Sequence, residues 1–303
     1  MVELRVIVQN ALKAGVAIPA FNVPYLPMIE PVIRAVVDHD SFALIETARL
    51  EWVKFKAGGP EVVAKEFFRW QVPDHVRLHL DHVPVIDEDG QRVDYLQIIQ
   101  QAIGLGYHSV MVDGSRLSLD ENIAATRQVA DSAHKSGIPC EAELGAILGH
   151  EAGPLPPYDE LFASGRGFTK VDEARRFVAE SGCDWLSVAI GNFHGAISEG
   201  YKDQKKIAAR LDLEHLETLS KAVPVPLVLH GGSGISREYV LASFQKGIAK
   251  INIATEIRQA YESSLQSTGK ISTAQEAVYE RTGWLIGEYF GLGNIQSKVT
   301  QQV

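Results

Sequence analysis

Eight short apolar runs recur along this chain, and amphipathic stretches with helical periodicity separate most of them. The runs are compact and mostly apolar, as strands buried on both faces of a parallel sheet are. We predict strands at residues 17–22, 42–47, 76–82, 108–113, 139–143, 185–191, 226–230 and 249–254. We predict helices at residues 94–104, 119–136, 171–181, 213–222 and 237–246.

The ends of the predicted helices carry capping residues. Ser118 or Asp120 can cap the helix at 119–136, and Gly137 follows it. Asp212 can cap a later helix in the same way. These signals place the helix boundaries independently of the apolar pattern.

The alternation of strand and helix predicts the α/β fold class. Eight such units indicate a (β/α)8 TIM barrel that forms a single domain over residues 1–303, with further helices after Thr255. An open doubly wound sheet is the alternative, but no Gly-rich dinucleotide-binding turn follows the first strand. Residues 145–168 are rich in Gly and Pro and lack periodicity. They predict a mobile loop over a site, with a passive surface excursion as the alternative.

Composition narrows the function classes. The chain is 46% hydrophobic and 22% charged, as globular proteins are, and its net charge of −9 gives no basis for expecting a nucleic-acid partner. No apolar run approaches the about 20 residues that cross a bilayer, so we expect no membrane partner. Cys140 and Cys183 are too few for a disulfide framework, and the N-terminus lacks a signal-peptide layout. We therefore expect a cytoplasmic protein.

Polar residues gather at the C-terminal ends of the predicted strands, which meet at one face of a barrel where active sites lie. Three of them are His82, His194 and His230. Three imidazoles with one open position can form a catalytic zinc site, where the metal acts as a Lewis acid. Taken singly, each histidine is more often a structural hydrogen-bonding residue, so it is their convergence that favours the metal site.

The pair Asp81-His82 sets a geometric condition. Side chains alternate between the two faces of a strand, so these neighbours point in opposite directions if the strand is regular. Both can serve one site only if the strand ends or bends there.

Two turns favour a phosphate site. HGGSG at 230–234 and NIAT at 252–255 each lead from a predicted strand into a helix. Backbone N–H groups at helix starts bind phosphate, and in barrels the turns after strands seven and eight commonly do so. Ordinary tight-turn glycines are the alternative.

Seven segments, in order along most of the chain, give a specific resemblance. The segments are PAFNV at 19–23, LHLDH at 78–82, GYHSVMVDGSRLSLDENI at 106–123, EAELGAILGHE at 141–151, VAIGNFHG at 188–195, LVLHGGSGI at 227–235 and KINIATE at 250–256. The chain resembles the class II, metal-dependent ketose-bisphosphate aldolases, which include fructose- and tagatose-bisphosphate aldolases. The resemblance implies reversible cleavage of a phosphorylated ketose to dihydroxyacetone phosphate and an aldehyde through a zinc-stabilised ene-diolate.

The resemblance also implies residue roles. His82, His194 and His230 look like the ligands of one zinc ion. Asp81 looks like the residue that exchanges a proton with the C4 hydroxyl, and Glu151 like the acid/base that works on C3. Asp113 and Glu143 look like groups that support the ligands or form an alternative metal position. The residues that look like the cradle for phosphate and a monovalent cation (Na⁺ or K⁺) are Gly195, Gly231, Gly232, Ser233, Asn252, Ala254 and Thr255.

A Schiff-base lysine replaces the metal in the other aldolase class. Lys250, inside KINIA, is the only lysine near a strand end, which disfavours the covalent route. The family further implies a homo-oligomer, a dimer or tetramer.

The sequence departs from the family on the side that holds the aldehyde. Tyr25 and Pro27 stand where the family has Asn and Glu, and Ala152 follows the loop acid in place of Asp. Asn22 and Arg49 are candidate contacts for that half, with Arg49 as an anion contact or an ordinary surface arginine. Two alternatives stay open: an aldolase for another phosphorylated ketose, such as an inositol-breakdown or sulfosugar intermediate, or a non-catalytic phosphosugar-binding barrel.

Overall fold

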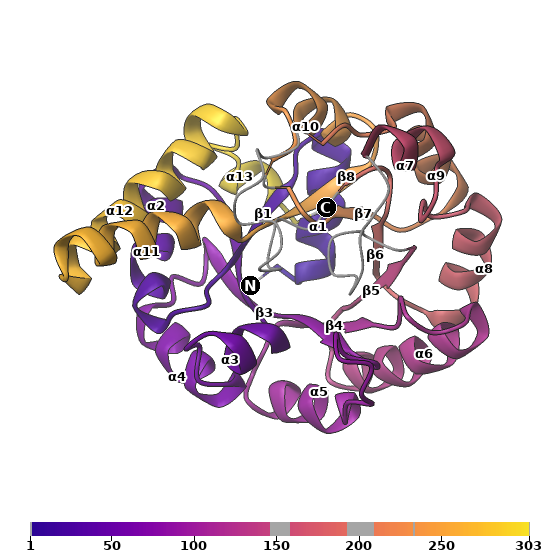
Figure 1. The fold of residues 1–303 in the computed structure, drawn as a ribbon, viewed down its shortest axis with the longest axis horizontal. Coiled ribbons are helices and arrows are strands. Elements are labelled where there is room, and N and C mark those ends of the chain that lie inside the picture. The colour runs from indigo at the N-terminus through magenta and orange to yellow at the C-terminus, as the bar shows by residue number, and fades with distance from the viewer. Residues whose placement is uncertain (1, 146–157, 193–208, 233, 303) are drawn as a thin grey trace.

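A closed barrel of eight parallel strands, β1 to β8 in sequence order, forms the centre of the molecule. The computed structural model describes residues 2–145, 158–192, 209–232 and 234–302. Helices surround the barrel as an outer ring (Figure 1). The prediction of a (β/α)8 TIM barrel is confirmed. The open doubly wound sheet is excluded, because β1 pairs with both β2 and β8.

Every observed strand overlaps its predicted run. The strands are β1 Ile18–Asn22, β2 Ala43–Ala48, β3 Val76–Pro84, β4 Ser109–Asp113, β5 Cys140–Leu144, β6 Trp185–Val188, β7 Leu227–Leu229 and β8 Ile248–Ile253. The strand predicted at 185–191 is wrong at its end. There the backbone N–H of Ile190 donates to Oδ1 of Asn192 at 2.8 Å rather than to a neighbouring strand.

The helices follow the strands as βα units require. In the first three quarters of the barrel they are α2 Ile29–Asp38, α3 Arg49–Lys54, α4 Pro60–Trp70, α5 Tyr95–Gly104, α6 Leu119–Lys135, α7 Tyr158–Ser164 and α8 Val171–Ser181, with a short 3₁₀ turn, η1 Leu26–Met28. Ser118, not Asp120, caps α6: its Oγ accepts from the Glu121 N–H at 3.4 Å, and Glu121 reaches back to the Ser118 N–H.

The helical turn α7 corrects one prediction. It lies inside the segment 145–168, which the sequence predicts to be irregular. Asp159 and Glu160 occupy the first turn of α7, where acidic side chains favour a helix N-terminus. Residues 146–157, the rest of the predicted loop, lie outside the described residues.

The remaining helices complete the ring and the C-terminal extension. They are α9 Leu213–Ala222, α10 Arg237–Phe244, α11 Thr255–Thr268, α12 Ile271–Trp284 and α13 Gln296–Val299, with a π-helical turn at Leu285–Tyr289 between the last two. Figure 1 shows α11 and α12 side by side, and α12 packs against α2, which confirms helices after Thr255 within the same domain. None of the helices in the described part of the chain is both long and apolar enough to cross a membrane.

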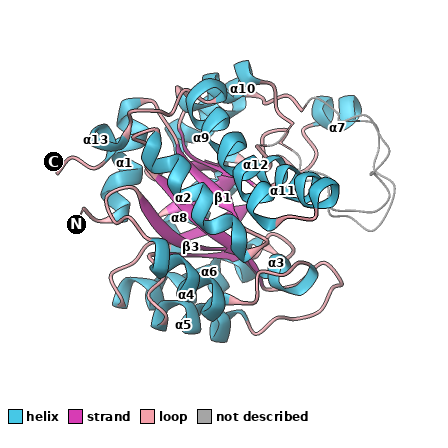
Figure 2. Ribbon diagram, turned by 90° about the vertical axis from the view of Figure 1, so that its left-hand side faces the viewer, coloured by secondary structure: helices cyan, strands magenta, loops and turns pink. Residues whose placement is uncertain are grey.

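One end of the barrel is closed by α1 Leu4–Ala14. Its buried residues Ile7 and Val8 pack with side chains near the starts of several strands, among them Ile18 and Trp185. Figure 2 shows α1 and both chain termini at one end of the barrel and α7 at the other. The C-terminal strand ends therefore open at the end that α1 does not cover.

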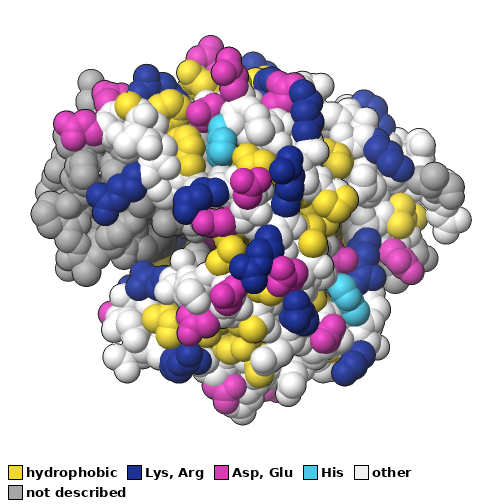
Figure 3. Space-filling view, turned by 90° about the vertical axis from the view of Figure 1, so that its right-hand side faces the viewer, with side chains coloured by type: hydrophobic (Ala, Val, Ile, Leu, Met, Phe, Trp, Pro, Cys, Tyr) yellow, Lys and Arg dark blue, Asp and Glu magenta, His cyan; other side chains and the backbone are white. Residues whose placement is uncertain are grey.

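Charged side chains of both signs cover the outside. On the face in Figure 3, Lys and Arg side chains are interspersed with Asp and Glu side chains. Several form exposed ion pairs one helical turn apart, such as Lys170 with Glu173 at 2.8 Å. Pairs of this kind stabilise a surface helix only slightly.

Candidate active site

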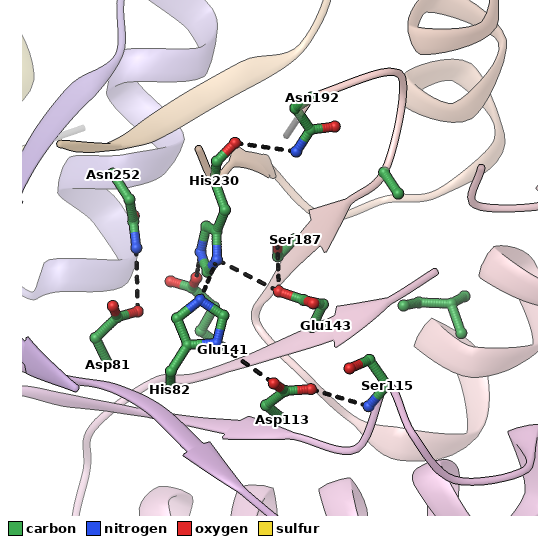
Figure 4. A network of polar contacts seen from close by, with 12 residues as sticks. Asp81, His82, Asp113, Ser115, Glu141, Glu143, Ser187, Asn192, His230 and Asn252 are labelled. Carbon is green, nitrogen blue, oxygen red and sulfur yellow. Dashed lines mark hydrogen bonds and ion pairs between the residues drawn. The ribbon is translucent and has the colours of Figure 1, made fainter. Parts of the chain in front are cut away.

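The third strand bends where the site requires it. The register between β3 and β4 shifts between Leu80 and Val83. His82 there has a backbone φ of +29°, a value that residues other than glycine rarely adopt. Such a bulge redirects a side chain. Asp81 and His82 therefore point into one cluster (Figure 4), which meets the condition set by their neighbouring positions in the sequence.

Two of the three predicted imidazoles meet at the mouth of the barrel. His82 comes from the bend in β3, and His230 follows the end of β7. Nε2 of His82 lies 2.7 Å from Nδ1 of His230, and the ring centroids are 4.5 Å apart. These two nitrogens face each other although 148 positions separate the residues. The third imidazole, His194, lies outside the described residues, as does Glu151.

A carboxylate contacts the outer nitrogen of each ring. Nδ1 of His82 lies 3.4 Å from Asp113 Oδ2, and Nε2 of His230 lies 2.8 Å from Glu141 Oε1. In a neutral imidazole, a nitrogen that donates to a carboxylate leaves the lone pair on the opposite nitrogen, which is the arrangement of metal-binding histidines. A carboxylate oxygen of Asp81 and one nitrogen of each ring lie within 4.8 Å of one another, so a negative charge stands beside the two imidazoles. The two imidazoles fit zinc.

Both oxygens of Asp81 are held by amides. Nδ2 of Asn22 donates to Oδ2 at 2.9 Å, and Nδ2 of Asn252 donates to Oδ1 at 3.0 Å. Asn22 and Asn252 thus both contact Asp81, although the sequence placed one on the aldehyde side and the other in the phosphate cradle. The sequence motifs around Asn22 and Asn252 could not predict that both side chains contact Asp81, because the contacts join three different strands.

Opposite charges determine the protonation of this cluster. Burial raises the pKa of Asp81, but the charges of His82 and His230 outweigh it, so the pKa falls well below its ordinary value. Burial lowers the pKa of His82, but the charge of Asp81 and the bond to Asp113 outweigh it and raise the pKa well above its ordinary value. Asp81 is therefore ionised at neutral pH and available as a proton acceptor.

Asp113 and Glu143 occupy different positions around the two rings. Burial raises the pKa of Asp113, but the hydrogen bond with His82 outweighs it and holds the pKa at about 2. Glu143 Oε2 lies 3.3 Å from Nδ1 of His230, the nitrogen that faces His82. Burial and the charge of Asp113 raise the pKa of Glu143. Asp113 is thus placed to orient His82, whereas Glu143 lies beside the nitrogen of His230 that faces His82.

The predicted phosphate cradle is described in part. Gly231 has a φ of +69°, and a Cβ on Gly232 would lie 2.9 Å from the side chain of Ile251, so this turn needs both glycines. Ala254 precedes the first turn of α11, which begins at Thr255. The backbone at this helix start is suited to an anion. The other predicted members, Gly195 and Ser233, lie outside the described residues.

Arg49 lies beside the site but already has a partner. Ala48 pairs in register with Asp81, so Arg49 follows directly at the mouth. Its Nη1 lies 3.5 Å from Asp87 Oδ2, and its side chain is 22% exposed. The arginine is therefore held at the rim with part of its surface accessible.

A layer of buried ionisable side chains inside the barrel was not predicted as a group, although the alternation of His79 with Asp81 indicated a packing or supporting role for that histidine. Its members, Glu46, His79, Glu141 and Lys250, are all fully buried. Each of the last three lies two residues before a predicted site residue, so strand alternation places it on the same inward face. That signal was in the sequence and could have revealed them.

Lys250 is an ion-pair residue and not a nucleophile. Burial lowers its pKa, but the charges of Glu141 and Glu46 outweigh it and raise the pKa above the ordinary value. A Schiff-base lysine must be neutral to react. The geometry therefore agrees with the sequence argument against the covalent route.

Comparisons with known proteins agree with this arrangement. Residues 2–291 match the family model described as fructose-bisphosphate aldolase class-II. Fructose-bisphosphate aldolases from Streptococcus pneumoniae and Streptococcus pyogenes are 31% and 34% identical to this chain, over 100% and 92% of it and 96% and 87% of their own lengths. The crystal structure of the YdjI aldolase from Escherichia coli K12 aligns with a TM-score of 0.76 and 30% identity, over 96% of this chain and 98% of that one.

Proposed function

Because the chain belongs to the class II fructose-bisphosphate aldolase family, it is an aldolase, and we propose that its substrate is a phosphorylated ketose of the ketose 1,6-bisphosphate type. The enzyme, a lyase, reversibly cleaves this ketose to dihydroxyacetone phosphate and an aldehyde. The observation that carries this proposal is the meeting of His82 and His230 at 2.7 Å beside the ionised Asp81. A binding barrel without catalysis needs no proton acceptor at that place, which disfavours the non-catalytic alternative.

His82, His194 and His230 would hold one zinc ion in each subunit. When bound, zinc supplies the positive charge of a Lewis acid to the negative charge that develops on the three-carbon half. Asp113 and Glu141 support this assignment, because each contacts the outer nitrogen of a ligand ring. A monovalent cation, Na⁺ or K⁺, belongs with the phosphate cradle.

The chain's own residues move the protons. Asp81 removes the proton of the C4 hydroxyl, and the C4 carbonyl forms as the C3–C4 bond breaks. Asn22 and Asn252 hold both oxygens of Asp81, which keeps the carboxylate in one orientation during that transfer. Glu151 then protonates C3 and releases dihydroxyacetone phosphate. The turns at Gly231-Gly232 and before Thr255 bind its phosphate, together with Gly195 and Ser233.

A second candidate function is cleavage of a different phosphorylated ketose. Tyr25 stands where the family has Asn, and its hydroxyl donates to Glu262 at 2.7 Å. Arg49 is paired with Asp87 at the rim. These contacts favour an aldehyde half held in another way than glyceraldehyde 3-phosphate is held. Inositol-breakdown and sulfosugar intermediates are the classes to include.

The test is a panel of phosphorylated ketoses, assayed for release of dihydroxyacetone phosphate with and without a chelator. We expect release from at least one ketose, its loss with the chelator, and its return with zinc. His194→Ala should remove zinc and activity together, whereas His134→Gln, on the surface beside Asp184, should keep both. Activity that survives the loss of His194 and of zinc would exclude the metal-dependent mechanism.

We further propose that the enzyme works in carbohydrate metabolism, in glycolysis or a related route, in the cytoplasm and as a homo-oligomer, a dimer or tetramer. The family supports the phosphosugar substrate. Light scattering of the purified chain measures the oligomer directly.

A further inference from the structure

A lysine lies at the centre of the barrel, beneath the site. Lys250 is on β8, two residues before Asn252, and its side chain is fully buried. Its Nζ lies 3.3 Å from Glu46 Oε2 and 2.9 Å from Glu141 Oε2. Glu46, His79 and Asp81 also have ligand atoms within 4.8 Å of one another, but the ammonium beside Glu46 already supplies positive charge there. The question is what this buried cation does.

One contact of the lysine leads to Asp81. Nζ of Lys250 donates to Oδ1 of Asn252 at 2.7 Å. A lysine ammonium can only donate, so this bond determines which side of the amide carries oxygen. The Nδ2 group of Asn252 must then point the other way, and it donates to Asp81 Oδ1 at 3.0 Å. With the amide reversed, an oxygen would face the carboxylate instead of a donor.

Another contact leads to His230. The ammonium pairs with Oε2 of Glu141, and Oε1 of the same carboxylate accepts from Nε2 of His230 at 2.8 Å. An ionised carboxylate can only accept, so the ring hydrogen must be on Nε2. In the neutral ring, the form that binds a metal, Nδ1 of His230 is then the lone-pair nitrogen, and it is the one that faces His82.

We propose that Lys250 is a positioning residue that orients the proton acceptor and the metal ligand at the same time. Through Asn252 it turns a donor toward Asp81, and through Glu141 it fixes the tautomer of His230. The part of the inference that runs through Asn252 to Asp81 rests on the proposed function. The part that runs through Glu141 to His230 concerns zinc binding alone. Losing the lysine should therefore impair two separable properties.

The experiment compares a double variant with a matched control. Lys250→Met with Glu46→Gln removes the ammonium together with the acid that pairs with it, so no buried carboxyl group loses its partner at position 46. Glu46→Gln alone keeps Lys250 and both of its outward contacts. Circular dichroism and urea unfolding establish that each variant is folded. Zinc affinity is measured by competition with a chromogenic chelator.

Two rates separate the two contacts. Asp81 acts only at the C4 hydroxyl of the ketose, so ketose cleavage needs it, whereas solvent exchange of the C3 proton of dihydroxyacetone phosphate does not. Relative to the control, the double variant should bind zinc about 10- to 100-fold more weakly. At saturating zinc, its cleavage rate should fall roughly tenfold further than its exchange rate.

Glu141→Gln removes the carboxylate charge that lies between Lys250 and His230, while Lys250 keeps its bond to Asn252. It should weaken zinc binding and leave the ratio of cleavage to exchange unchanged, and it remains informative if the double variant does not fold. Unchanged zinc affinity in Glu141→Gln, or an unchanged ratio in the folded double variant, overturns the inference. If the wild-type protein neither cleaves ketoses nor exchanges the proton, the proposed function fails instead, and the zinc measurements still test the contact through Glu141.

Discussion

A buried acid beside the site should make stability depend on pH in an unusual direction. Glu51, in α3, is only 7% exposed, and its Oε2 accepts from the backbone N–H of Ala48 at 2.8 Å. Burial raises the pKa of Glu51 from 4.5 to about 8, and the bond from Ala48 offsets only part of this effect. The folded protein therefore holds a proton on Glu51 that the unfolded chain has already released at neutral pH.

The sign and size follow from linkage. Between pH 4.5 and about 8 the folded state binds more protons at this position, so the free energy of unfolding falls as the pH rises. Each pH unit in that window corresponds to about 1.4 kcal/mol, which gives about 5 kcal/mol over the whole window. Glu51→Gln cannot ionise, and its amide oxygen can still accept from Ala48. The variant should match the wild type near pH 4.5 and exceed its stability by up to about 5 kcal/mol at pH 8 and above.

Urea unfolding of the chelator-treated protein at several pH values between 4.5 and 9 measures this directly. Other buried acids contribute equally to both proteins, so the informative quantity is the difference between the two curves. The difference should grow with pH and level off near pH 8. Parallel curves, or a variant that loses stability as the pH rises, would refute the argument that Glu51 is protonated in the folded state.

Two further predictions concern stability away from the metal. A Cβ on Gly114 would lie 2.2 Å from Oδ1 of the buried Asn122, so Gly114→Ala should displace that amide and lower the free energy of unfolding by about 2–5 kcal/mol. Gly104→Ala is the control, because a Cβ there meets no atom within 4 Å, and it should be neutral or slightly stabilising. Thermal unfolding measures both variants. Burial and the charge of Arg77 lower the pKa of His108 to about 4, so stability should fall as the pH drops from 6.5 toward 4. His108→Gln should remove about 3 kcal/mol of that fall, measured by urea unfolding at both pH values, and an identical fall in both proteins would contradict it.

The fold could be predicted because a parallel barrel has a strong sequence signature. Strands that are buried on both faces appear as short apolar runs, and eight of them alternate with helical stretches. The boundaries were less predictable. The run at 185–191 stays apolar although β6 ends at Val188. Beyond that point the side chain of Asn192 accepts from the backbone N–H of Ile190, and the apolar pattern cannot reveal this contact.

The site could be predicted only where polar residues end an apolar run. His82 and His230 stand at such ends, and the structure brings them together. That Asp81 joins them depends on the register shift in β3, which alternation alone argues against. The partners of Asp81 could not be assigned, because which amide contacts it depends on the registers of three strands at once.

The buried charges in this barrel have a role that offsets their free-energy cost. Below the site, the inward layer at the starts of the strands is apolar and closed by α1, as the contacts of Ile18 and Trp185 show. Above it lies an ionic layer, although each buried ion costs several kcal/mol in lost hydration and an apolar layer of similar volume is often at least as stable. Stability therefore does not account for Lys250 and Glu141. Their contacts do. Lys250 and Glu141 each have one contact within the layer and another toward the mouth, so the layer orients the carboxylate of Asp81, through Asn252, and the imidazole of His230.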